Sequence, residues 1–599
     1  MQFETDIFNV AFEAVQKLFN VKVDTERIQL QRTKAEFEGD ITLVVFSLTK
    51  ISKKSPEETG SLLGHYLLNH SEIIQSFNTV KGFLNLVIKD EAWLHQLKKA
   101  QQHAHFGFAV SKKPGTVVVE YSSPNTNKPL HLGHIRNNLL GWSVAEILKA
   151  DGNEVKKVNL VNDRGIHICK SMLAWLKSGN GETPQSTGLK GDHLVGKYYV
   201  EFDRMLREEK QLLMEQGLSE DEAEKKSTLM EEAREMLRQW ENGDKDIISL
   251  WKTMNGWVYE GFDVTYRNLG VDFDKIYYES ETYLLGKKIV EEGIKKKVFQ
   301  KKPDGSVRID LTEDGLDEKV VLRSDGTAVY ITQDIGTARL RFDDYRFSKM
   351  IYVVGNEQDY HFKVLKLITK KLGYDWSDAI YHLSYGMIDL PSGKMKSREG
   401  TVVDADELLN DLFAESERIT KELGKIDDFG SEEAKQLYRS IGLGALKYFL
   451  LRVDPEKRML FNPAESIDFN GDTGPFIQYT FARIQSVLRK ARMTEALCEY
   501  ENRQFSNQHV INKEERELII HLLQFPYVVH EAAEKLSPAL IAHYAFSTAR
   551  LFNHFYHHHS IADIENSDTS AFRLKLTAFT GKVIRSALQM MGIHAPERM

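Results

Sequence analysis

Two histidines around a glycine, His131 and His134, are the residues of this sequence best placed to do chemistry. They follow a β-branched run at 116–121 and a turn rich in Ser, Asn and Pro, and a helical pattern runs from Gly133 to Ala150. The start of such a helix presents free N–H groups to a phosphate, and Gly133 leaves bare backbone for an adenine ring. The pattern predicts a nucleotide-binding turn, although two histidines at a helix start also fit an ordinary surface pair.

A second apolar run, residues 155–161, follows the predicted helix. Strand, helix and strand in this order predict a βαβ unit with parallel strands. Ligands of such sheets bind at the carboxyl ends of the strands. The histidines are therefore expected at the ligand-binding edge.

A basic loop, Gly-Lys-Met-Lys-Ser-Arg-Glu-Gly at 393–400, lies far downstream. Asp404, with Glu407 three residues later, predicts that a helix begins after it. A charge run alone is usually a solvated loop. Paired with the histidines, it offers cations for the β- and γ-phosphates while pyrophosphate leaves, and imidazole donors serve the α-phosphate.

His-Leu-Gly-His and the basic loop resemble the HIGH and KMSKS signatures of class I aminoacyl-tRNA synthetases. The likeness narrows to arginyl-tRNA synthetases over nearly the whole chain, in five segments: 119–125, 324–334, 352–361, 471–479 and 595–599. The family implies an enzyme that activates L-arginine with ATP to arginyl-adenylate and pyrophosphate. It then transfers arginine to the 3′ end of tRNA(Arg). Mg²⁺ is expected to arrive with ATP, and no structural metal is expected.

The resemblance also assigns ATP chemistry to particular residues. The second lysine of KMSKS falls on Ser397, and Lys128, upstream of the histidines, is expected to compensate. The catalytic residues implied are Lys128, His131, His134 and Lys394. The ATP-binding residues implied are His131, Gly133, His134, His361, Lys394, Lys396, Ser397 and Arg398. The HIGH region comprises Pro124, Asn125, Thr126, Asn127, Lys128, Pro129, Leu130, His131, Leu132, Gly133 and His134.

A guanidinium is planar, always charged and rich in donors, so its pocket needs carboxylates with aromatic or hydroxyl neighbours. Tyr330 and Asp334 are four residues apart, on one face of the helix that the family places there. The resemblance makes them the side-chain recognition pair, with Glu279 as a second carboxylate. It assigns Glu120, Asn125 and Gln358 to the α-amino and carboxylate groups of arginine. Each of these residues, taken alone, also fits a solvated or structural role. Lysine as the substrate would also favour an acidic pocket.

Three parts are expected along the chain. Residues 1–110 form an additional α+β domain that contacts the tRNA elbow, with Phe83 and Asn85 as candidates. Residues 115–425 form a Rossmann-like catalytic α/β domain on a parallel sheet, with a helical insertion around 204–245. Residues 440–599 form an all-helical anticodon-binding bundle, with Tyr479 and Arg483 as candidates. Within that bundle, residues 518–533, 538–554 and 572–591 are each expected to be one helix.

Composition agrees with a globular, multidomain protein: 599 residues, 42% hydrophobic and 28% charged. The net charge of −8 does not exclude tRNA, because binding needs only a local basic face. Cys169 and Cys498 are too far apart to suggest a zinc site or a disulfide framework. A cytoplasmic monomer is expected, with no membrane span and no DNA partner. His557, His558 and His559 are not expected to bind a metal, because consecutive helical residues point about 100° apart.

Two other functions stay open at this stage. A class I synthetase for another amino acid would share both signatures without needing Glu279, Tyr330 and Asp334 together. A catalytically silent, synthetase-derived RNA-binding protein would have no use for the triphosphate-binding residues.

Overall fold

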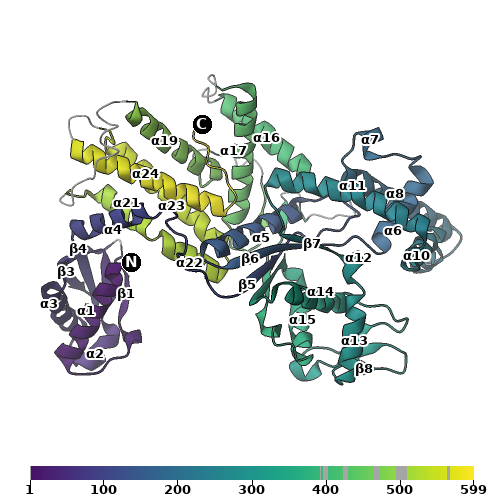
Figure 1. Ribbon diagram of the computed structural model, residues 1–599, viewed down its shortest axis with the longest axis horizontal. Coiled ribbons are helices and arrows are strands. Elements are labelled where there is room, and N and C mark those ends of the chain that lie inside the picture. Colours follow the sequence, from purple (N-terminus) through teal and green to yellow (C-terminus); the bar gives the residue numbers. More distant parts are fainter. Residues whose placement is uncertain are drawn as a thin grey trace.

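The computed structural model describes residues 2–34, 36–390, 393–394, 403–422, 429–462, 468, 471–493, 509–562 and 567–599. Figure 1 shows a purple N-terminal domain on one side, a central sheet with long helices reaching out from it, and a green-to-yellow helical bundle. Of the basic loop, the backbone of Lys394 is described, whereas Lys396, Ser397 and Arg398 lie outside the described residues.

The N-terminal domain packs helices on an antiparallel sheet of order β1-β2-β4-β3. Leu43, Leu84 and Leu86 alternate toward its core and are fully buried. The α+β architecture expected for this part is confirmed. Its strands are β1 (Gln29–Arg32), β2 (Ile41–Val44), β3 (Ile74–Val80) and β4 (Phe83–Ile88); its helices are α1 (Gln2–Phe19), α2 (Phe46–Ser52), α3 (Pro56–His70) and α4 (Asp90–Gln102).

The catalytic part is built on a parallel sheet of order β12-β11-β5-β6-β7, which confirms the predicted fold class. The strands are β5 (Thr116–Glu120), β6 (Glu154–Val161), β7 (Lys275–Tyr278), β11 (Lys349–Gly355) and β12 (Ile380–Tyr385). Helix α5 (Leu132–Ala150) connects β5 to β6. From β5 the chain continues to β6 and β7 on one side, whereas β11 and β12 lie on the other. The order therefore reverses between β5 and β11, which is where such sheets bind ligands.

The excursion between β6 and β7 is helical and extends beyond the 204–245 of the predicted insertion. It contains α6 (Ile166–Ser178), α7 (Pro184–Thr187), α8 (Gly191–Glu215), α9 (Glu220–Lys226), α10 (Thr228–Glu241) and α11 (Lys245–Leu269). Long helices α8 and α11 pack side by side and return toward the sheet (Figure 1). The charged segment marks only the outer end of this insertion, because the inner turns bury Leu194, Tyr198 and Phe202.

The region between β7 and β12 carries the remaining elements around the sheet's carboxyl edge. These are α12 (Glu279–Thr282), α13 (Leu285–Lys295), a small sheet of β8 (Gln300–Lys301), β9 (Val307–Ile309) and β10 (Lys319–Leu322), then α14 (Tyr330–Tyr345), η3 (Asn356–Gln358) and α15 (Asp359–Lys371).

The C-terminal part is an all-helical bundle. Its helices are α16 (Ala405–Glu422), α17 (Ser431–Leu451), α19 (Gly474–Arg492), α21 (Lys513–Leu523), α22 (Phe525–Lys535), α23 (Pro538–His558) and α24 (Ser567–Met590). The prediction of a single helix at 518–533 is wrong. The helix is interrupted at Gln524, because Pro526 has no N–H group to donate to the preceding turn. Among the helices of the described residues, none is long and apolar enough to cross a membrane.

Candidate active site

The turn that leaves β5 has a strained backbone. Ser122 and Ser123 have φ angles of 79° and 45°, in the left-handed region that non-glycine residues rarely adopt. The Ser122 N–H donates to Asn137 Oδ1 on α5 at 2.5 Å, and the Ser123 N–H donates to Asn159 Oδ1 on β6 at 3.0 Å. Such strain costs about 1–3 kcal/mol per residue, persists only where neighbours enforce it, and clusters at functional sites. Asn137 and Asn159 were missed in the sequence analysis. The signal that could have found them is that each is a polar residue inside an otherwise apolar helix or strand.

The two histidines cap α5 reciprocally. His131 Nδ1 accepts from the Gly133 N–H at 3.1 Å, and His134 Nδ1 accepts from the His131 N–H at 3.2 Å. Because each Nδ1 is an acceptor, each neutral ring carries its proton on Nε2, which stays available as a donor. A Cβ on Gly133 would lie 3.0 Å from the His131 ring, so the glycine makes room for that ring.

Both imidazoles are held neutral. Burial and the nearby Lys128 charge lower the pKa of His131 to about 4, against the opposing pull of Asp404. Burial, His131 and Lys128 lower the pKa of His134 well below its usual value. Burial also lowers the pKa of Lys128 itself. The pair therefore offers neutral N–H donors beside a lysine, which suits a phosphate that gains negative charge.

Two adjoining cavities lie at this edge of the sheet. One, of about 450 Å³, is lined by Lys128 and His131 and, across from them, by residues of α8 and α16. The other, of about 480 Å³, is lined by Glu279 and Tyr330. Three residues line both cavities: Asn125, Asn127 and His167. The arrangement can hold two ligands that meet at the HIGH region.

Of the carboxyl groups expected to bind arginine, Glu279 lines the second cavity, whereas Asp334 and Glu120 do not. Burial raises the pKa of Glu279 to about 7, against the opposing charge of Arg164, and the negative charges of Asp163 and Asp334 add to the rise. Burial raises the pKa of Glu120, and the Asp334 charge contributes there as well. Asp334 thus lies within electrostatic reach of both Glu120 and Glu279, and a cationic ligand would relieve its repulsion with them.

Helix α14 presents three polar side chains on one stripe. Tyr330, at its first turn, is 71% exposed, and Asp334 Oδ2 accepts a hydrogen bond from His361 Nε2 at 2.6 Å. Two turns further on, the buried Arg341 forms an ion pair with Glu120. Arg341 was missed from the sequence, although its seven-residue spacing from Asp334 was a signal. His361, expected near ATP, lies against the carboxylate expected to bind the guanidinium.

Two further expected residues are placed by the elements that carry them. Gln358 is exposed at the end of η3, just beyond the carboxyl end of β11. Lys394 belongs to β14 (Gly393–Lys394), where its backbone pairs with that of Asp389 in β13 (Ile388–Leu390).

The tRNA candidates differ in accessibility. Phe83 is half-buried, with Phe37 stacked at 6.3 Å, Phe46 edge-on at 5.5 Å and the Lys34 ammonium 5.5 Å from its ring. Asn85 is fully buried and engaged by Thr42 at 2.6 Å, so it lies within the sheet and not on its surface.

In the helical bundle, the Arg483 guanidinium lies over the rings of Tyr479 and Tyr556, at 4.9 and 5.4 Å from their centres. These rings and the guanidinium come from α19 and α23, so two helices build the group.

Two family models match most of the chain. Residues 96–462 match the catalytic domain of class I (R) tRNA synthetases, and residues 477–599 match the DALR anticodon-binding domain. The chain is 53% identical to the arginine–tRNA ligase of Parabacteroides distasonis and 54% identical to that of Bacteroides fragilis, each over 100% of both chains. The structure superposes on arginyl-tRNA synthetase from Thermus thermophilus with a TM-score of 0.78, 24% identity, and 98% and 99% of the two chains covered. With catalytic and anticodon-binding models both matched and full-length relatives above half identity, the chain belongs to the class I arginyl-tRNA synthetases and is an arginine–tRNA ligase.

Proposed function

We propose that the cavity lined by Glu279 and Tyr330 binds L-arginine and that the cavity lined by Lys128 and His131 binds ATP. The observation that carries this assignment is the shared wall of Asn125, Asn127 and His167. Two ligands bound on either side of that wall can bring the arginine carboxylate to the α-phosphate. Catalysis then consists of positioning and charge stabilisation, without a protein nucleophile.

In the arginine cavity, Asp334 and Glu279 accept the guanidinium donors, and Tyr330 covers or hydrogen-bonds the group. Asn125, Glu120 and Gln358 serve the α-amino and carboxylate groups. Glu120 already balances Arg341, so its role includes holding that internal cation in place. Two carboxylates therefore remain for the single charge of the substrate side chain.

In the ATP cavity, the Nε2–H groups of His131 and His134 donate to the α-phosphate. Lys128, Lys394, Lys396, Ser397 and Arg398 serve the β- and γ-phosphates, while Gly133 and His361 complete the assigned ATP set. An oxygen of the arginine carboxylate attacks the α-phosphorus, the bond to the β-phosphate oxygen breaks, and pyrophosphate leaves with the negative charge. The terminal ribose hydroxyl of tRNA(Arg) then attacks the adenylate carbonyl carbon and releases AMP.

Mg²⁺ bound to the phosphates would neutralise charge on the leaving pyrophosphate. The cavity lining fits a metal carried in by ATP, because Lys128 and His131 serve the phosphates and, of the lining carboxylates Asp404 and Glu407, the first is already ion-paired with His193.

We assign tRNA contacts to both flanking parts. Residues 1–110 contact the elbow through the aromatic group around Phe83, with Asn85 holding Asn78 at 2.8 Å from within the sheet. Residues 440–599 bind the anticodon loop through Tyr479 and Arg483, because unstacked bases pair well with aromatic rings and guanidinium planes. Residues 115–425 carry the chemistry. The enzyme works as a monomer in the cytoplasm, a reducing compartment that suits two cysteines without a disulfide framework.

ATP–pyrophosphate exchange with each of the twenty amino acids, run with and without tRNA(Arg), tests the assignment. Of the twenty amino acids, only arginine is expected to support exchange. If exchange also requires tRNA(Arg), activation depends on bound tRNA, as is typical of the family. His131→Ala should abolish exchange because it removes an α-phosphate donor. Normal exchange by His131→Ala would overturn the assignment of the ATP cavity.

A further inference from the structure

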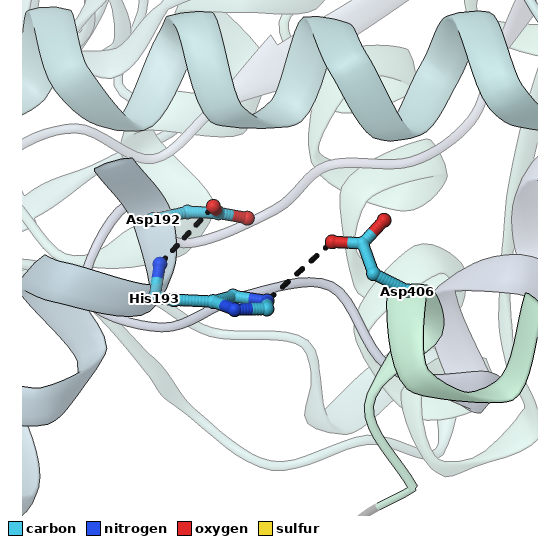
Figure 2. Close-up of side chains that lie close together, drawn as sticks. All are labelled: Asp192, His193 and Asp406. Atoms are coloured by element: carbon cyan, nitrogen blue, oxygen red, sulfur yellow. Dashed lines mark hydrogen bonds and ion pairs between the residues drawn. The ribbon is translucent and has the colours of Figure 1, made fainter. Parts of the chain in front are cut away.

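The insertion meets the start of α16 through a cluster of charged side chains. Lys190, Asp192 and His193 lie at the start of α8, and Asp404 and Asp406 lie at the start of α16. Figure 2 shows the His193 ring directed from α8 toward Asp406, with Asp192 beside it. His193 and Asp404 also line the cavity that contains His131. We call these five residues the α8–α16 cluster.

The cluster is closely paired. His193 Nε2 lies 3.2 Å from Asp404 Oδ2 and 3.4 Å from Asp406 Oδ2. The Lys190 ammonium forms an ion pair with Asp406, lies 3.2 Å from Asp192 Oδ2 and donates to Thr265 Oγ1 at 2.6 Å. Two cationic side chains of the insertion thus hold acids of α16.

A metal ion is not the best explanation of this cluster. Ligand atoms of Asp192, His193 and Asp406 lie within 4.8 Å of one another, as a metal site requires. However, the Lys190 ammonium already contacts both carboxylates, and a metal there would face its positive charge. The neighbouring lysine therefore takes the place that a metal would occupy.

Asp404 connects the cluster to the HIGH histidine. It forms an antiparallel backbone bridge with His131, flanked by bonds from the Leu132 N–H to the Val403 carbonyl and from the Ala405 N–H to the Leu130 carbonyl, both 3.0 Å. Asp404 Oδ1 also accepts from the N–H groups of Asp406 and Glu407, at 2.9 and 3.1 Å, and so caps α16. One carboxylate oxygen caps the helix while the other faces His193.

We propose that Lys190 and His193 of the insertion are positioning residues for arginine activation, which fix His131 through the Asp404 bridge. The proposal rests on the assigned role of His131 in ATP binding. A shift of the α16 N-terminus would move the bridge, the turn of residues 130–132 and with it the first imidazole. Misplacement of a catalytic group by about 1 Å can lower a rate by about 100-fold.

The protonation of His193 supports a charge-dependent role. Pairing with Asp404 and Asp406, reinforced by Asp192 and opposed by burial, raises the pKa of His193 to about 10. Burial raises the pKa of Asp406, but His193 and Lys190 outweigh it and bring this pKa to about 2. A histidine whose folded pKa is raised stabilises fully below its ordinary value of 6.5, and that stabilisation is lost as the pH rises through about 10. His193 is thus a cation throughout the physiological range.

Pyrophosphate exchange by His193→Gln and Asp406→Asn, with arginine, ATP and tRNA(Arg), tests the proposal. Each variant should lower kcat roughly 10- to 100-fold while KM for arginine changes less than about 2-fold. The effects of the two variants should be less than additive in the double variant, because both break the His193–Asp406 contact. His193→Lys, which restores a cation, should recover most of the lost rate. Arg204→Gln, further along α8 in an exposed ion pair, is the matched control and should retain the wild-type rate.

The rate ratio of wild type to His193→Gln should stay constant from pH 7 to about pH 9 and fall toward one as the pH rises through about 10, where the wild-type imidazole loses its charge. A merely structural role would leave that ratio independent of pH. Wild-type kcat in both His193→Gln and Asp406→Asn would overturn the proposal. His131→Ala, measured in parallel, separates the two hypotheses: if it loses exchange while the cluster variants do not, the positioning role alone fails.

Discussion

Glu279 is the carboxyl group whose charge should control arginine binding. Its pKa of about 7 in the free enzyme means that it is protonated below neutrality, and a bound guanidinium needs it ionised. KM for arginine should therefore rise as the pH falls from 8 to 6, by up to about tenfold per pH unit below 7. Steady-state ATP–pyrophosphate exchange between pH 6 and pH 8 measures this KM. Glu279→Gln should have a high KM with little pH dependence, and an unchanged pH profile in that variant would contradict the assignment.

Lys128 is expected to supply the positive charge of the second KMSKS lysine, which the basic loop lacks. Ser397 stands where KMSKS has its second lysine, and Lys128 lines the cavity that contains His131. Lys128→Ala should lower kcat for activation at least about 100-fold, with little change in arginine affinity, because a phosphate-binding cation is lost. Single-turnover adenylate formation measures the activation rate, and equilibrium binding of arginine measures the affinity. Near-normal activation would refute compensation by Lys128, and Lys128→Arg should retain part of the rate.

The position of a functional residue could be predicted where the residues that determine it are neighbours in the sequence. His131, Gly133 and His134 are neighbours, and their reciprocal capping follows from a three-residue spacing. For Arg341 the sequence offers only a helical spacing from Asp334, and the ion pairs of Arg341 and His193 could not be predicted, because their partners lie in other elements: Glu120 on β5 and Asp404 before α16. Only the folded sheet brings these groups together.

Helix α14 connects the arginine cavity to the core of the sheet. Its buried Arg341 balances Glu120, and Tyr277 and Tyr352 flank the guanidinium with ring centres at 5.2 and 5.5 Å. Removing one partner of a buried pair leaves an uncompensated charge and costs about 3–5 kcal/mol. Arg341→Met should therefore lower the thermal unfolding midpoint markedly. The double variant Glu120→Gln/Arg341→Met should recover much of it without recovering activity, and equal midpoints for both variants would contradict the pairing.

Element boundaries were predicted well where capping chemistry marks them. Asn512 and Glu515, spaced as a sequence can show, form a capping box at the start of α21, and Pro538 opens α23 where the helix 538–554 was expected to begin. The break between α21 and α22 was missed because the apolar pattern continues through Pro526. The insertion was bounded too tightly because its inner turns resemble ordinary core helices.

At the scale of the whole molecule, the three parts are joined by ion pairs between domains. Arg516 on α21 pairs with Asp90 and lies 3.3 Å from Asp40 of the N-terminal domain. Between the catalytic part and the bundle, His530 Nδ1 on α22 lies 2.9 Å from Asp151 Oδ1 at the end of α5. The sequence predicted three parts but not these contacts, since each joins residues hundreds of positions or several helices apart.

The N-terminal domain should contribute to tRNA affinity and not to adenylate chemistry. Its aromatic group, Phe37, Phe46 and Phe83 with Lys34 beside it, combines stacking surfaces with a cation although the chain as a whole is acidic. Base stacking on one aromatic ring is worth about 1–3 kcal/mol, so Phe83→Ala should raise KM for tRNA(Arg) roughly tenfold. Arginine-dependent exchange at saturating tRNA should keep its wild-type kcat.

Aminoacylation kinetics with varied tRNA(Arg) measure that KM directly. Leu18→Ala changes another exposed apolar side chain of the same domain, outside the aromatic group, and should leave KM unchanged. Lys34→Ala should raise KM and weaken its salt dependence, because one phosphate-neutralising charge is lost. If Phe83→Ala and Lys34→Ala both bind tRNA as tightly as wild type, the elbow contact lies elsewhere on the molecule, and the domain acts through its ion pairs with the helical bundle instead.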